Sequence, residues 1–90
     1  MQIKEIKTIE DVNAFLKFLI IDLELNFHPD DPFTDYQNRA GEKLFTEREA
    51  WVLEVLLEQA FFVAQEVDID LYGLSLDISL DHLSHLKMAA

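Results

Sequence analysis

One segment limits the possible folds of this chain more than any other: residues 46–67, TEREAWVLEVLLEQAFFVAQEV. Thr46 and Glu49 have the spacing of a capping box, in which each side chain accepts a hydrogen bond from the other residue's backbone amide. The residues that follow contain no Gly or Pro and are good helix formers. The segment therefore predicts a long helix at 47–67.

The surface of this helix is unusually apolar. At about 100° per residue, one narrow polar line runs along it. The line consists of Glu47, Glu54, Glu58 and Gln65. Three large aromatic residues lie on or beside that line: Trp51, Phe61 and Phe62. A helix with so much apolar surface either forms the buried centre of its domain or packs against a second subunit.

A first helix is predicted at 9–26. It begins after Thr8, whose hydroxyl can accept a hydrogen bond from an unpaired amide of the first turn. Pro29 restricts the residue before it to extended conformations, so the helix has to end before that point. A short helical turn is then predicted at 32–38, with Asp31 as its N-cap, because Asp followed by Pro is a common way to enter a helix.

The last part of the chain has two interpretations. A strand at 74–80 is possible because apolar and polar residues alternate there. A helix at 70–87 gives two apolar stripes on different sides, as expected for a helix between two neighbours. We favour the helix, capped by Asp70, because a lone strand lacks a pairing partner. The fold class expected is all-α, a small bundle of three to four helices.

Composition restricts the partners. Ninety residues fit a single domain, 1–90, and a chain this short can bury only a small core. Its formal net charge of −11 argues against binding to nucleic acid, whose affinity comes from Lys and Arg. The absence of cysteine excludes disulfides and thiolate metal sites.

No membrane association is expected. The oily segment 15–25 is interrupted by Lys17, Asp22 and Glu24, well short of the roughly 20 apolar residues that a membrane span needs. Acidic residues also occur near the start of the sequence, where a secretory signal would need an uninterrupted apolar run. A cytoplasmic protein is therefore expected.

Metal-ligating side chains gather in two places. They are His28, Asp30 and Asp35 within FHPDDPFTDY (residues 27–36), and His82 with His85 in the third helix. Carboxylates suit hard cations, and two histidines three apart on a helix can reach one zinc ion. Neither group has the spacing of a known ligand motif, so a structured corner and two surface histidines are the favoured interpretations.

No catalytic constellation is found. The sequence contains no nucleophile elbow, no glycine-rich phosphate loop and no Glu-x-x-His motif for a di-iron bundle. We therefore expect neither an enzyme nor a cofactor.

The leading hypothesis is a protein–protein interaction module. Its apolar helix surface exceeds what one small core can cover, which predicts a homo-oligomer or a complex with another protein. The candidate partner-binding residues combine aromatic side chains with an acidic rim. They are Trp51, Phe61, Phe62, Glu54 and Glu58.

Two alternatives follow from the charged residues. The first is an acidic neutraliser of a basic partner, similar in size, acidity and helical content to bacteriocin immunity proteins and antitoxins. Its binding should weaken with salt. The second is a metal-binding domain that uses the histidines and aspartates named above.

Overall fold

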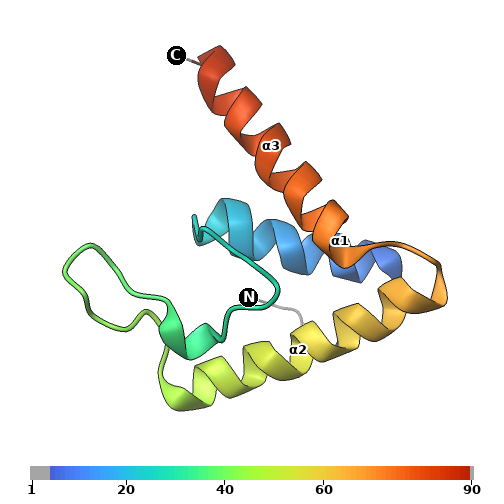
Figure 1. Cartoon of the computed structure of the whole chain (residues 1–90), viewed down its shortest axis with the longest axis horizontal. Coiled ribbons are helices and arrows are strands. Elements are labelled where there is room, and N and C mark those ends of the chain that lie inside the picture. Colours follow the sequence, from blue (N-terminus) through green and yellow to red (C-terminus); the bar gives the residue numbers. More distant parts are fainter. Residues whose placement is uncertain (1–4, 90) are drawn as a thin grey trace.

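The computed structural model describes residues 5–89, with side chains described as far as residue 84. Its elements are α1 (Ile9–Lys17), a π-helical turn η1 (Phe18–Asp22), a 3-10 turn η2 (Phe33–Asp35), α2 (Glu47–Glu66) and α3 (Leu71–Ala89). The all-α prediction is confirmed, and residues 74–80 are helical (Figure 1). Within residues 5–89, β pairing is limited to an isolated bridge between Gln37 and Lys43.

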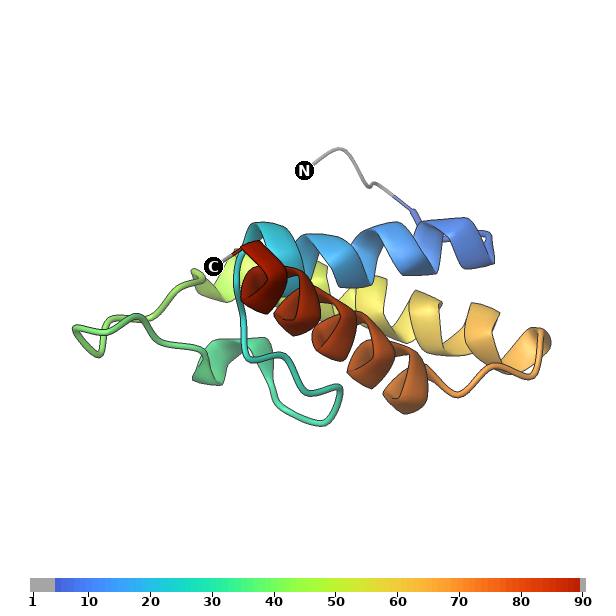
Figure 2. The same cartoon turned by 90° about the horizontal axis from the view of Figure 1, so that it is seen from above.

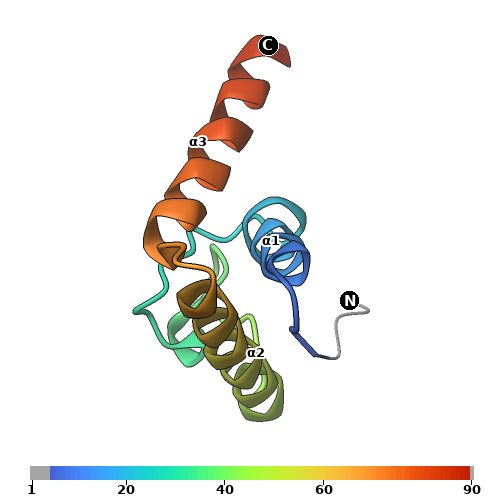
Figure 3. The same cartoon turned by 90° about the vertical axis from the view of Figure 1, so that its right-hand side faces the viewer.

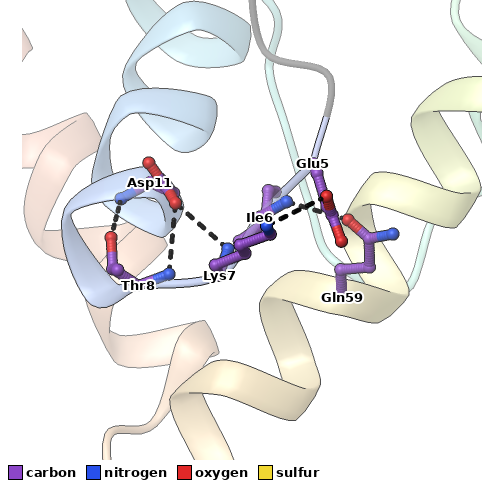
Figure 4. Close-up of polar contacts among 6 residues, drawn as sticks. All are labelled: Glu5, Ile6, Lys7, Thr8, Asp11 and Gln59. Carbon is purple, nitrogen blue, oxygen red and sulfur yellow. Dashed lines mark hydrogen bonds and ion pairs between the residues drawn. The ribbon is translucent and has the colours of Figure 1, made fainter.

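The start of α1 is a complete capping box. The Asp11 amide donates to Thr8 Oγ1 at 3.2 Å, and the Thr8 and Lys7 amides donate to Asp11 Oδ2 at 3.1 and 3.0 Å (Figure 4). The Ile6 amide donates to Gln59 Oε1 at 2.9 Å and so joins the segment before α1 to α2. Thr8 was predicted as the cap, and the structure confirms it.

The end of the first helix differs from its prediction. The helix was expected to reach residue 26, but it widens into η1 and ends at Asp22. Glu24 then takes a left-handed conformation with φ 54°, and the Leu25 amide donates to the Leu19 carbonyl at 3.1 Å. This widened exit turns Leu23 outward and buries Leu25 and Phe27 instead.

The corner between α1 and α2 is built on Phe33. Its ring is fully buried and lies 6.0 Å from that of Phe27, 5.8 Å from Tyr36 and 6.0 Å from Phe45. The turn predicted at 32–38 is shorter, Phe33–Asp35. The prediction that Asp31 caps it is wrong, because no side chain caps η2. Packing of the aromatic rings holds this corner instead.

Helix α2 follows its prediction within one residue. The Glu49 amide donates to Thr46 Oγ1 at 3.1 Å, and the Thr46 amide donates to Glu49 Oε1 at 2.9 Å, which completes the capping box. At its other end the Ile69 amide donates to the Ala64 carbonyl at 2.8 Å, and the Asp68 amide donates to Gln65 at 3.2 Å. This pair of bonds is a Schellman motif.

The helices form an open arrangement. Helices α1 and α2 lie side by side and antiparallel (Figures 1 and 2). Helix α3 contacts both near its start, and its C-terminal half projects away from them (Figure 3). The core lies between α1 and α2 and under the first turns of α3, where Leu71, Ser75 and Ile78 are buried.

Acid is expected to weaken both capping boxes. The backbone amides of Lys7 and Thr8 lower the pKa of Asp11, and the Thr46 amide lowers that of Glu49. The unfolded chain therefore takes up these protons first, so this stabilisation is present above about pH 4.5 and is lost as pH falls further. Urea denaturation at pH 6 and pH 3 should give a smaller change in unfolding free energy for Asp11→Asn/Glu49→Gln than for the unsubstituted chain. Equal changes would exclude the caps as a source of acid sensitivity.

Asp68 is a position at which substitution by glycine should stabilise the fold. It has φ 56° where helices usually end in glycine, and an L-residue there is strained by roughly 1 kcal/mol. Asp68→Gly should raise the free energy of unfolding by about 0.5–1 kcal/mol, measured by thermal and urea denaturation. Asp68→Ala is the control, because it removes the same charge but keeps the strain. Equal gains in both variants would assign the effect to charge.

Candidate functional site

The outward side of α2 carries the first candidate site. Trp51 and Phe62 are 67% and 62% exposed, and the exposed Glu58 lies between them. We call these three residues the α2 outer face. They point away from the buried side of the helix, which contains Leu53, Leu56, Leu57, Ala60 and Ala64.

Two of the five predicted partner-binding residues have structural contacts instead. Glu54 is half-buried, and its Oε1 accepts a hydrogen bond from the Phe33 amide at 2.9 Å. Phe61 is half-buried against the core, and its ring lies 5.8 Å from that of Tyr72. The structure therefore leaves Trp51, Phe62 and Glu58 on the outer face and places Glu54 and Phe61 at the joins to the corner and to α3.

A second candidate site lies on α3 and was not among the predicted partner-binding residues. Leu76, Leu80 and Leu83 are 59%, 54% and 53% exposed. We call these three residues the α3 stripe. Their spacing of four and then three residues places them on one side of the helix. The pattern of two apolar sides was visible in the sequence, but it gave no sign of which side would face the core.

The surroundings of the two sites differ in charge. Exposed Glu47 and Glu66 lie beside the α2 outer face, together with one base, Arg48. Among the described side chains, the positions next to the α3 stripe on the helix surface carry a single charge. They are Tyr72, Gly73, Asp77, Ser79 and Ser84, while Asp81 lies further round the helix. One surface is thus aromatic and acidic, and the other is aliphatic with a mostly neutral border.

The FHPDDPFTDY segment forms a hydrogen-bonded network with the start of α3. The Tyr72 hydroxyl donates to Asp30 Oδ1 at 2.5 Å, and the Asp30 amide donates to His28 Nδ1 at 3.1 Å. The His28 amide in turn donates to the Tyr36 hydroxyl at 3.1 Å. Donation to the carboxylate raises the pKa of Tyr72, and burial raises that of Tyr36. These contacts tie the corner to α3.

The metal candidates whose side chains the structure describes do not converge. Among the side chains described, no three His, Asp or Glu residues lie close enough together to hold a metal ion. The Asp30 backbone amide donates a hydrogen bond to the His28 ring, and the Asp30 carboxylate accepts one from the Tyr72 hydroxyl. His82 instead borders a groove near α3, and the side chain of His85 lies outside the described part.

An open groove of about 370 Å³ runs between α3 and the exit from η1. It is lined by Ile20, Glu24, Leu25, Asn26, Ser79, His82 and Leu83. Leu83 therefore belongs both to the α3 stripe and to the edge of this groove. The mixed lining contains no constellation of nucleophile, base and oxyanion donors.

None of the helices in the described residues is long and apolar enough to span a bilayer. No known protein family, curated protein or solved structure matches this chain.

Proposed function

We propose that this chain is a non-enzymatic protein–protein interaction module that self-associates through the α3 stripe. The observation that carries this proposal is the exposure of Leu76, Leu80 and Leu83 on one side of a helix that projects from the body. Contiguous exposed apolar residues on a small protein mark interaction surfaces. A cytoplasmic location, expected from the sequence, is part of the same proposal.

The three leucines supply only part of the free energy that a dimer needs. Complete burial of a leucine contributes about 1.5–3 kcal/mol, so a leucine that is half exposed gains about 1 kcal/mol on burial. Three leucines in each of two copies give roughly 6 kcal/mol, which is near the low end of the about 4–15 kcal/mol lost with translational and rotational freedom. Contacts beyond these leucines therefore have to contribute, and the dimer should dissociate on dilution.

Sedimentation velocity across a range of protein concentrations tests this proposal. Leu80→Lys should weaken the dimer about 30-fold, because two copies each lose an apolar contact and desolvate a charge. Leu44→Lys is the control: it makes the same substitution at an exposed leucine outside the helices. A chain that stays monomeric at every concentration would rule out self-association.

The α2 outer face favours a second function, the binding of a basic partner. Exposed aromatics bordered by carboxylates suit a surface rich in Arg and Lys, because aromatic rings attract cations and carboxylates pair with them. This binding would have the character of an acidic neutraliser and should weaken as salt is added. Self-association of chains that each carry −11 should instead strengthen with salt.

A pull-down with immobilised protein distinguishes these two surfaces. Basic proteins retained at low salt and lost at high salt, and no longer retained by Trp51→Ala, would support the neutraliser function. Retention by Trp51→Ala equal to that by the unsubstituted chain would exclude the α2 outer face as the binding surface.

A further inference from the structure

We propose that the occupant of the α3 stripe is the α3 helix of a second copy, packed antiparallel about a two-fold axis near the level of Ile78. This inference rests on the self-association proposed above and specifies its geometry. In this arrangement a residue that precedes Ile78 by a given number of positions faces the residue of the second copy that follows Ile78 by the same number. Leu76 then faces Leu80, and Leu83 faces Gly73.

The charge around the stripe favours a second copy over a basic protein. A chain with 18 acidic residues bears the uncharged Gly73, Ser79 and Ser84 along the border of this stripe, with Asp77 as the one carboxylate among the described side chains there. A basic surface would find only this carboxylate to pair with. Two copies that meet here bring their two Asp77 side chains together but keep most of their other acidic residues apart.

The shape of the stripe is complementary to itself. The spacing of Leu76, Leu80 and Leu83 is that of a helix seam whose side chains insert between those of a neighbouring helix. Pairing about Ile78 places the large side chain of Leu83 over Gly73, which has none. The same contact occurs twice, as an isologous interface requires.

Gly73 has no backbone reason to be glycine. It lies inside the first turns of α3 outside the left-handed region, where glycine is unfavourable relative to alanine. An added Cβ would lie 3.3 Å from Oδ2 of Asp70, whose Oδ1 accepts the Tyr72 amide, so the cap of α3 would have to shift slightly to admit it. Space for Leu83 of a second copy is a further reason for a glycine at this position.

The projection of α3 favours the antiparallel direction. Its first turns pack on the body and its C-terminal half extends away (Figures 1 and 3). A parallel pair would place two acidic bodies at the same end of the helices. An antiparallel pair places them at opposite ends, opposes the helix dipoles and gives each projecting half a neighbour.

Single-cysteine variants test the direction, because the chain contains no other cysteine. Ser79→Cys lies close to the axis, so its two copies are about 3 Å apart along the helices, whereas those of Ser84→Cys are about 18 Å apart. A short bismaleimide should therefore link Ser79→Cys to itself and leave Ser84→Cys unlinked. A parallel pair would instead link Ser79→Cys to Ser84→Cys when the two variants are mixed.

Two further variants test the register. Gly73→Leu should weaken the dimer at least tenfold, because it fills the space that Leu83 enters, and should leave the monomer folded by circular dichroism. Asp77→Asn should tighten the dimer about twofold, because the two Asp77 side chains lie near each other across the axis.

The outcomes separate this inference from the proposed function. A monomer at every concentration rejects self-association itself. A dimer in which Ser79→Cys stays unlinked, or in which the mixed pair is linked, rejects the antiparallel arrangement and leaves self-association in place. A dimer unaffected by Gly73→Leu rejects the register.

Discussion

Replacement of Phe33 by alanine is expected to lower the free energy of unfolding by about 3–5 kcal/mol. The ring is fully buried and packs on three other aromatic rings, so its removal leaves a cavity at the corner between α1 and α2. Small domains have about 5–15 kcal/mol of stability in total, and the variant should therefore be close to unfolding at ambient temperature.

Urea denaturation followed by far-UV circular dichroism measures this loss. The single tryptophan, Trp51, is largely exposed and therefore a poor fluorescence probe of unfolding. Phe62→Ala is the matched control, because it removes the same side chain from an exposed position and should change stability by less than about 0.5 kcal/mol. Similar losses in both variants would contradict the central role of Phe33.

Replacement of Leu71 by alanine is expected to cost about 2–5 kcal/mol. Leu71 is buried at the start of α3, where the Ser75 hydroxyl donates to its carbonyl at 2.9 Å. Among the described side chains of α3, Leu71 is buried together with Ser75 and Ile78, so the cavity should also loosen the packing of this helix. Thermal denaturation and hydrogen exchange of the α3 amides would show both effects.

Leu76→Ala makes the same substitution on the opposite side of the same helix. In dilute, monomeric protein it should change stability by less than about 0.5 kcal/mol, because Leu76 is already exposed. The pair of variants therefore tests which side of α3 faces the core. A larger loss for Leu76→Ala than for Leu71→Ala would mean that the helix is rotated relative to this structure.

Local sequence signals were enough to predict where α1, α2 and α3 begin. Thr8, and Thr46 with Glu49, predicted their caps because capping depends on residues three apart along the chain. Asp70 was likewise predicted as the cap of α3, and its Oδ1 accepts the Tyr72 amide at 3.2 Å.

Features that depend on distant contacts were missed. Glu54 seemed part of a solvated polar line, but it accepts the amide of Phe33, 21 residues away. The two apolar sides of α3 were equivalent in the sequence, and only packing on α1 and α2 decides that Leu71 and Ile78 are buried. The widened turn at Phe18–Asp22 contains no proline or glycine from which it could have been predicted.

That widened turn gives the chain one residue more than a regular helical turn contains. Its geometry is that of an α-helix into which one residue has been inserted. Deletion of one residue from Phe18–Asp22 should restore regular helix through Leu23, and Leu25 and Phe27 would then lose the exit that buries them. We therefore expect the first helix to tolerate substitution along its exposed side far better than a change in its length.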